Sequence, residues 1–240
     1  MTQRTGEARF PRTNYKTSRH CVAYLDILGG TDIILHDDQN KHLNIINMIF
    51  EDALGESKMF SDNIFVKIFS DNILLALSTE DECREQNITN ILGLVRNIIH
   101  EAADYGYLIR GAITEGDFVH NDIIVYGKAL VEAVEMEEKY AIYPRVIVQK
   151  ETAVLLPHYF YPCEDGWAML NPYIFGIGSY DFINFRQTFL DQLGKNKKNA
   201  KVRQKIMWAI NNFNIIGKAM RQMGSLRSLI TREEIENVLK

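Results

Sequence analysis

Two aspartates of this sequence are candidates for chemistry because of the residues around them. Asp26 lies inside an apolar run, between Leu25 and Ile27, and Asp71 lies between two apolar runs, in the polar cluster of residues 70–72. A lone ionised carboxylate in a buried strand costs several kcal/mol, so Asp26 needs a cationic partner, hydrogen-bond donors or a metal. Two converging carboxylates suit hard divalent cations such as Mg²⁺ or Mn²⁺.

Paired carboxylates that hold two divalent ions are typical of phosphoryl transfer, in which the ions clamp the attacking and leaving oxygens of an in-line displacement. The sequence therefore predicts a metal-dependent site with two ions. Two plainer interpretations stay open. Asp26 is a structural residue if it is bridged to Lys67 or Arg110, and Asp71 taken alone is an ordinary turn residue.

Hydrophobic patterning predicts the elements that must position these aspartates. A short β-branched and aromatic run that ends in two glycines is typical of a buried strand, and apolar residues at helical spacing indicate amphipathic helices. The turn residues around Asp71 predict a β-hairpin. The expected order is strand 20–28, helix 41–54, strands 64–69 and 73–77, helix 85–104 and strand 107–113.

This β-α-β-β-α-β order is that of a ferredoxin-like α+β fold. In that fold the first strand pairs antiparallel with the third, so the end of strand 20–28 lies beside the hairpin that begins strand 73–77. That pairing brings Asp26 next to Asp71.

Further elements are expected after this core. They are a strand at 123–126, a helix at 128–140, a strand at 145–149, a proline-rich loop region and a helical tail. The chain is therefore expected to divide into an N-terminal arm at 1–19, a catalytic domain at 20–156 and a C-terminal loop and helical extension at 157–240.

Composition restricts the class of protein. With 240 residues, 46 % of them hydrophobic, the chain is long enough for one domain with a sizeable core. The net charge of -4 gives no general case for nucleic-acid or membrane binding, and no apolar run approaches the ~20 residues that span a bilayer. The three cysteines lack metal-ligand spacing, and the basic N-terminal stretch lacks the apolar segment of a signal peptide. We therefore expect a cytoplasmic protein with reduced thiols.

Three motifs, taken in order, resemble those of the class III nucleotidyl cyclases. The strand CVAYLDILGG is similar to that family's first strand, F-x-D-I-x-G-F, and the hairpin VKIFSDNILLAL to its K-x-x-G-D-x-x-L-A. The third is LIRGAITEGDFVHNDIIVYGKALVEAVEME, which resembles R-x-G-I-x-x-G followed by W-G-x-x-V-N-x-A-S-R-M. The variant details are most similar to the bacterial pyrimidine cyclases of the Pycsar antiphage systems.

The resemblance implies a role for each matching position. Asp26 and Asp71 fall on the metal-binding aspartates, and the carbonyl of Ile27 on a further ligand of the Mn²⁺ or Mg²⁺ ions. Lys67 falls on the lysine that contacts the base. The turn that receives the triphosphate corresponds to Leu28, Gly29, Gly30 and Thr31, and exposed N–H groups at a helix start favour phosphate on physical grounds as well.

Departures from the family pattern concern the base and the transition state. Val131 and Glu135 replace the asparagine and arginine with which purine cyclases orient the ribose and stabilise the transition state. We expect the stabilising cation to be Arg110, with Arg145 as the second candidate. The alternative for each is an ordinary strand arginine that pairs with Glu115 or with the acids of the helix at 128–140. Ile124 replaces a polar group that reads the purine. The pyrimidine ring is expected to stack on nearby aromatic side chains, Tyr126 and Phe69.

The resemblance thus implies a cyclase that converts UTP to 3′,5′-cyclic UMP and pyrophosphate, with UTP favoured over CTP because Lys67 donates to the acceptor edge of uracil. It also implies a head-to-tail homodimer with sites at the interface, and a product that acts on a separate effector in antiphage defence. Three alternatives stay open: a cytidylate cyclase that makes cyclic CMP, an enzyme of the same fold that joins two nucleotides, and a degenerate module that only binds nucleotide.

Two charged segments complete the list of candidates. The basic run near the C-terminus is best interpreted as a solvated loop and helix start, with triphosphate steering and nucleic-acid contact as alternatives. Its members are Lys195, Lys197, Lys198, Lys201, Arg203 and Lys205. The acids of the helix at 128–140 are predicted to form its exposed face, and they are Glu132, Glu135, Glu137 and Glu138.

Overall fold

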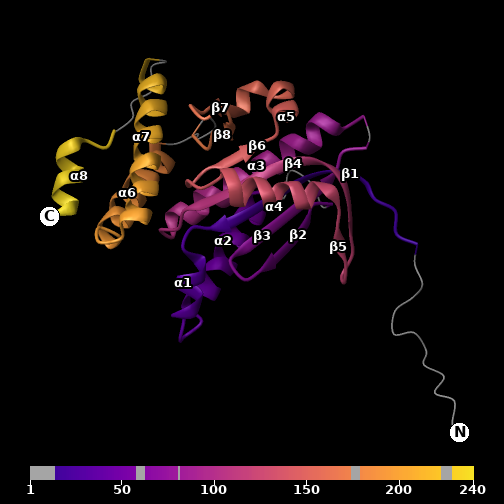
Figure 1. Ribbon diagram of the computed structural model, residues 1–240, viewed down its shortest axis with the longest axis horizontal. Coiled ribbons are helices and arrows are strands. Elements are labelled where there is room, and N and C mark those ends of the chain that lie inside the picture. The colour runs from indigo at the N-terminus through magenta and orange to yellow at the C-terminus, as the bar shows by residue number, and fades with distance from the viewer. Residues whose placement is uncertain (1–13, 58–62, 81, 174–178, 223–228) are drawn as a thin grey trace, which may run out of the picture.

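The strand β1 (Ser18–Ile27) lies in the interior of a mixed sheet because its side chains alternate between two apolar layers. It belongs to a computed structural model that describes residues 14–57, 63–80, 82–173, 179–222 and 229–240 (Figure 1). Cys21 and Leu25 face one core cluster, and Val22 faces another on the opposite side. Burial on both faces explains the near-continuous apolar run, to which Asp26 is the polar exception near the strand's end.

The strand order of the sheet is β2-β3-β1-β4-β6-β8-β7, and β5 pairs with β4. The other bounds are β2 Phe65–Phe69, β3 Asn72–Ser78, β4 Ile109–His120, β5 Val125–Tyr126, β6 Val146–Val148, β7 Phe160–Pro162 and β8 Ala168–Leu170. β1 pairs antiparallel with both β3 and β4. The predicted α+β fold, with its antiparallel pairing of the first and third strands, is therefore confirmed.

Helices cover both faces of the sheet (Figure 1). α2 (Lys41–Ser57) and α3 (Arg84–Asp104) pack on the face of Cys21, and α4 (Lys128–Tyr140) packs on the face of Val22. The bounds of α4 are those predicted. A short helix, α1 (Gly30–Leu35), follows β1 directly and was not predicted. None of the helices in the described ranges combines the length and the apolarity that crossing a lipid bilayer requires.

The C-terminal helices share a second apolar core with the end of α3 and with β8. They are α6 (Ser179–Lys195), α7 (Ala200–Gln222) and α8 (Arg232–Leu239), and they gather at one side of the sheet in Figure 1. The stretch predicted as loop-rich contains α5 (Lys150–Leu155), a 3₁₀ turn (Pro157–Tyr159) and the two last strands. The predicted boundary after residue 156 falls just before that turn, and β7 and β8 then continue the sheet.

Candidate active site

Asp26 and Asp71 meet at the end of β1. In the pairing of β1 with β3, Asp26 lies opposite Asn72, and the backbone N–H of Ile27 donates to the carbonyl of Asp71 over 3.2 Å. Both aspartates are 9 % exposed, and both line one cavity of about 300 Å³. The predicted convergence of the two residues is confirmed, and their chemical roles stay predictions.

Two tight turns hold this arrangement. Ser70, between β2 and β3, has a φ of 60°, which is the left-handed region where the resemblance expects glycine. Gly29, after β1, has a φ of 83°, and its carbonyl accepts a hydrogen bond from the N–H of Ile33 over 3.2 Å. The next residue, Gly30, approaches Asp71 so closely that a Cβ would lie 2.4 Å from the aspartate's own Cβ.

Arg110, on β4, balances part of the charge of Asp26. Its Nε lies 2.6 Å from Asp26 Oδ2 and 2.9 Å from Glu137 Oε1. This bridge is one of the plainer interpretations of Asp26, and it is present. Burial nevertheless raises the pKa of Asp26; Arg110 lowers that pKa, the charge of Asp71 raises it again, and the net result is a raised value. A further cation between the two carboxylates would therefore be favoured.

Glu137 corrects the prediction that the glutamates of α4 form an exposed face. Its side chain is buried against Arg110, whereas Glu135 is exposed and pairs with Lys139 over 3.2 Å. Burial raises the pKa of Glu137 to about 7, against the opposing effect of Arg110. Its Oε1 is held by the ion pair with Arg110 rather than by a well-aligned hydrogen bond among the described residues, and α4 thereby adds a third carboxylate to the site.

The cavity has more acidic than basic side chains. Arg110 is its one cation among the described residues, and its acids are Asp26, Asp71, Glu137 and Glu138. Across the part of the chain that the structure describes, no group of three or more His, Cys, Asp or Glu side chains is arranged to cage a metal. Two carboxylates and a backbone carbonyl suit instead an ion such as Mg²⁺ or Mn²⁺, which keeps water and binds substrate oxygens. The residues therefore fit the predicted ions.

Two further residues, Tyr24 and Asn72, line the cavity although the sequence indicated no role in the site for either. Tyr24 donates from its hydroxyl to Asn72 Oδ1 over 2.6 Å. Burial, together with the neighbouring carboxylates, raises the pKa of Tyr24 to about 12, so its hydroxyl stays a donor at neutral pH. The alternation of side chains along β1 is the signal that places Tyr24 on the same face as Asp26.

The residues predicted to contact the triphosphate lie around the same turn. Gly29, Gly30 and Thr31 line the aspartate cavity, while Leu28 lines an adjoining cleft. Lys67, predicted to contact the base, pairs with Leu74 of β3, which in turn pairs with Tyr24 of β1. Lys67 is therefore on the same face of the sheet as Tyr24 and Asp26, but it does not line the cavity within one chain.

Tyr126 lies far from the aspartates of its own chain. It pairs with Val119, nine residues along β4 from Arg110, which is the register partner of Asp26. At ~3.3 Å per residue the separation is about 30 Å. Tyr126 is 69 % exposed, so contact with a nucleotide at Asp26 would have to be made in the site of a partner subunit.

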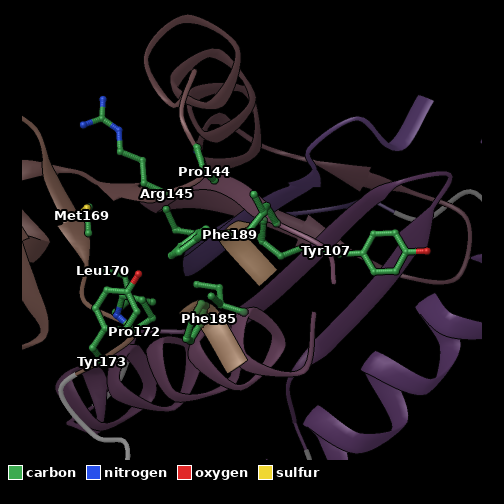
Figure 2. A pocket seen from close by; sticks show the side chains of 13 residues that line it. Tyr107, Pro144, Arg145, Met169, Leu170, Pro172, Tyr173, Phe185 and Phe189 are labelled. Carbon is green, nitrogen blue, oxygen red and sulfur yellow. The ribbon is translucent and has the colours of Figure 1, made fainter. Parts of the chain in front are cut away.

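Arg145 does not line the aspartate cavity. It forms an ion pair with Asp165, donates to the carbonyl of Tyr140 over 3.0 Å and lies 5.2 Å from the ring of Trp208. Arg145 and Phe189 both line a separate, mostly apolar cavity of about 30 Å³, and Figure 2 shows the guanidinium of Arg145 extending away from Phe189. That cavity has room for water but not for a nucleotide. A substrate-binding role for Arg145 is therefore not supported within one chain, because its guanidinium is held by structural partners.

Comparison with solved structures identifies the fold. The monomeric guanylyl cyclase domain of the RhoGC fusion protein from the aquatic fungus Blastocladiella emersonii matches with a TM-score of 0.53 and 14% identity, over 64% of this chain and 95% of that one. The guanylate cyclase domain of RhGC from Catenaria anguillulae, in complex with GTP, gives 0.52 and 14%, over 65% and 96%. The adenylyl cyclase CyaB from P. aeruginosa gives 0.50 and 12%, over 68% and 98%.

No protein-family model matches the sequence, and no curated protein matches it. At these low identities the likeness concerns the fold alone. The architecture is that of the class III nucleotidyl cyclase core.

Proposed function

We propose that this chain is a nucleotidyl cyclase that acts on a nucleoside triphosphate with two divalent ions. The observation that carries the proposal is the convergence of Asp26 and Asp71 in one acidic cavity beside the turn at Gly29 and Gly30. In this arrangement the two carboxylates to which we assign the ions lie next to the N–H groups of a helix start, which favour phosphate. The fold shared with guanylyl and adenylyl cyclase domains supports the same class of reaction.

In the proposed reaction the ribose 3′ hydroxyl loses its proton to solvent and its oxygen attacks the α-phosphorus. The bond from that phosphorus to the bridging oxygen of the β-phosphate breaks, and pyrophosphate leaves. Divalent ions held by Asp26, Asp71 and the Ile27 carbonyl supply acidity for the 3′ hydroxyl and positive charge for the phosphates when bound. The turn at Gly29 orients the phosphates. Arg110, held by the buried Glu137, provides positive charge at the reacting phosphate.

For the substrate we propose UTP ahead of CTP, with cyclic UMP as the messenger for a separate effector in antiphage defence. Val131 and Glu135 lie exposed on α4 where purine cyclases have ribose-orienting side chains, and Ile124 has no polar group for a purine edge. Lys67, a donor on the Asp26 face, suits an acceptor edge of uracil. The alternative is a cytidylate cyclase. If Lys67 binds the 2-carbonyl oxygen, which uracil and cytosine share, it does not distinguish UTP from CTP.

Competition among the four nucleotides tests this specificity. With equal concentrations of UTP, CTP, ATP and GTP and with Mn²⁺, we expect cyclic UMP as the main product, at roughly tenfold or more over either purine product. The reason is that a buried polar edge of a purine base without a hydrogen-bond partner costs ~1–3 kcal/mol. Products are resolved by mass spectrometry. Cyclic AMP or cyclic GMP as the main product would contradict pyrimidine specificity, and cyclic CMP would contradict the Lys67 step alone.

The same experiment separates the rival functions. A product that joins two nucleotides would indicate the dinucleotide-forming class. Nucleotide binding without pyrophosphate release would indicate a degenerate module, against which the acidic cavity argues, because a pure binding domain gains nothing from an excess of buried carboxylates.

We further propose a head-to-tail homodimer in which each site combines both chains. The separation of about 30 Å between Tyr126 and Asp26 along β4 supports it, since these two residues can meet one nucleotide only across an interface. Exposed apolar side chains on the two hairpins and on α4 offer a surface for such contact. They are Phe69, Ile123, Tyr126 and Val131.

Mixed dimers test the shared site. Asp26→Asn alters one half of the site, and Tyr126→Ala removes from the other half a stacking contact worth ~1–3 kcal/mol. In a mixture of the two impaired variants, half of the dimers regain one intact site, so about a quarter of wild-type activity should return.

The matched control mixes Asp26→Asn with Arg110→Ala. Because Arg110 contacts Asp26 within one chain, both changes fall in the same half, and no activity should return. If mixing Asp26→Asn with Tyr126→Ala restores no activity, the shared site is refuted. It is also refuted if a chain that sediments as a monomer is fully active.

A further inference from the structure

A cleft of about 560 Å³ opens beside the aspartate cavity, between the start of α2 and the hairpin formed by α6 and α7. Gly29 lines both spaces, so they adjoin. The lysines of the cleft are Lys41, Lys195 and Lys205, and its one acid among the described residues is Asp32. The balance of charge is therefore opposite to that of the aspartate cavity.

The hairpin is fastened to the core, which fixes where its lysines lie. On α6, Thr188 Oγ1 donates to the carbonyl of Ala103 over 2.5 Å, and Gln192 Nε2 donates to the carbonyl of Gly106 over 2.6 Å. Ala103 lies in the last turn of α3 and Gly106 just after it, so both bonds fasten α6 to the end of α3. Leu193, next to Gln192, is fully buried in the second core. The cleft is therefore bounded by packed helices.

Lys205, on α7, is electrostatically connected to the aspartate cavity. Burial and the charge of Arg110 lower its pKa, while Asp26 and Glu137 act in the opposite direction. A lysine whose charge is only partly balanced gains from a bound anion. Lys205 lines the cleft together with Gly29, and Gly29 also lines the aspartate cavity, so one elongated anion that passes Gly29 would reach both spaces.

The other residues of the basic run form the solvated loop and helix start that the sequence predicts. Lys197, Lys198 and Lys201 are exposed and do not line the cleft. Arg203 donates to the carbonyl of Lys197 over 2.9 Å, which closes the turn between the two helices. Lys195 is also exposed but lines the cleft, and Lys205 lines it as a half-buried side chain.

We propose that Lys195 and Lys205 of the C-terminal hairpin, together with Lys41 of α2, form a subsite for the terminal phosphates of the substrate and for the departing pyrophosphate. The inference rests on the proposed function, since it takes the α-phosphate to lie at Asp26. A polyphosphate chain that passes Gly29 leaves the acidic cavity and enters the basic cleft. Lysine suits this task because it contacts phosphate as a mobile point charge.

Inorganic tripolyphosphate is the probe, titrated calorimetrically into the full chain with a chelator present, so that neither metal nor base takes part. Lys195→Ala and Lys205→Ala are each expected to raise its Kd roughly fivefold or more, because each removes a charge at close range. The double variant should lose more than either. Lys205→Arg keeps the charge and should keep the affinity.

Lys198→Ala and Lys201→Ala are the matched controls, since they remove the same charge from the same hairpin outside the cleft. Their Kd should stay within about twofold of wild type, because their charges lie outside the cleft and salt screens their effect on an anion bound inside it. Thermal unfolding of each variant separates lost binding from lost folding. In turnover, the cleft variants should raise KM for the triphosphate by a factor similar to that in Kd.

The outcomes distinguish this inference from the function on which it rests. Unchanged affinity in the double variant, or equal weakening by the controls, would overturn the subsite even in a chain that makes cyclic nucleotides. A chain without cyclase activity that still needs Lys195 and Lys205 to bind tripolyphosphate would refute the proposed function and retain the anion subsite.

Discussion

Replacing Asp26 or Asp71 by asparagine is expected to lower turnover by roughly a thousandfold or more, because charge stabilisation by a bound ion is worth several kcal/mol. Each substitution removes one of the two charged ligands in the cavity and preserves the side chain's size. Mn²⁺ titration by calorimetry should show weaker binding in both variants. Turnover is measured as pyrophosphate release.

The fold should survive both substitutions. Burial and the charge of Asp71 already disfavour the ionised form of Asp26, so a neutral amide is not costly there, and Arg110 keeps Glu137 as its partner. In Asp71→Asn the backbone carbonyl still accepts from the N–H of Ile27. We therefore expect the Tm to change by only a few degrees, which corresponds to ~1 kcal/mol.

Asp117→Asn is the matched control for these variants. It makes the same chemical change on β4, at the far end of the β1 pairing, where Asp117 is exposed and lies opposite Arg19. Its turnover should equal that of the wild type. If Asp26→Asn or Asp71→Asn keeps near-normal activity with Mn²⁺, the aspartates do not hold the catalytic ions.

The convergence of the aspartates was predictable because it depends on short-range patterns. The apolar run around Asp26 and the turn residues around Asp71 each indicate a local structure, and the element order then determines which strands pair. α4 was predictable for the same reason. These features need no knowledge of which side chains meet across the sheet.

Glu137 was missed although a signal for it exists. Neighbouring glutamates make the end of α4 look uniformly polar, but Ala129, Ala133 and Glu137 recur at intervals of four and share the buried face. The high glutamate content obscures this periodicity, which the two alanines indicate. The charge of Glu137 is therefore buried, and Arg110 compensates it through an ion pair.

Long-range partners explain what no local pattern could predict. Arg145 is held by Asp165 and Trp208, which come from later elements, so its sequence neighbourhood carries no sign of that role. Likewise, the basic run contains lysines of identical chemistry, and only the docking of α6 on α3 separates Lys195 and Lys205 from the others. Tertiary packing, rather than local propensity, makes these assignments.

Gly30→Ala is expected to lower kcat/KM about a hundredfold, because a misplacement of ~1 Å at a reacting centre has an effect of that size. The added Cβ would lie 2.4 Å from both Cβ and Oδ2 of Asp71 and 2.8 Å from its Cγ. Gly30 is not among the glycines with a positive φ, so alanine suits the backbone and the clash is the sole obstacle. Asp71 must therefore move.

Gly55→Ala is the matched control, because nothing lies within 4 Å of a Cβ at that helical position. It should keep full activity and gain up to ~1 kcal/mol of stability from its better helix propensity. Gly30→Ala should instead lose ~1–3 kcal/mol through overpacking, and it should require more Mn²⁺ for half-maximal turnover, since the displaced ligand binds the ion less well. The two effects are separable by following turnover against Mn²⁺ concentration well below the Tm. Wild-type kcat and an unchanged Mn²⁺ requirement in a folded Gly30→Ala variant would show that the position of Asp71 does not matter to the reaction, and the two-metal site would then have to be abandoned.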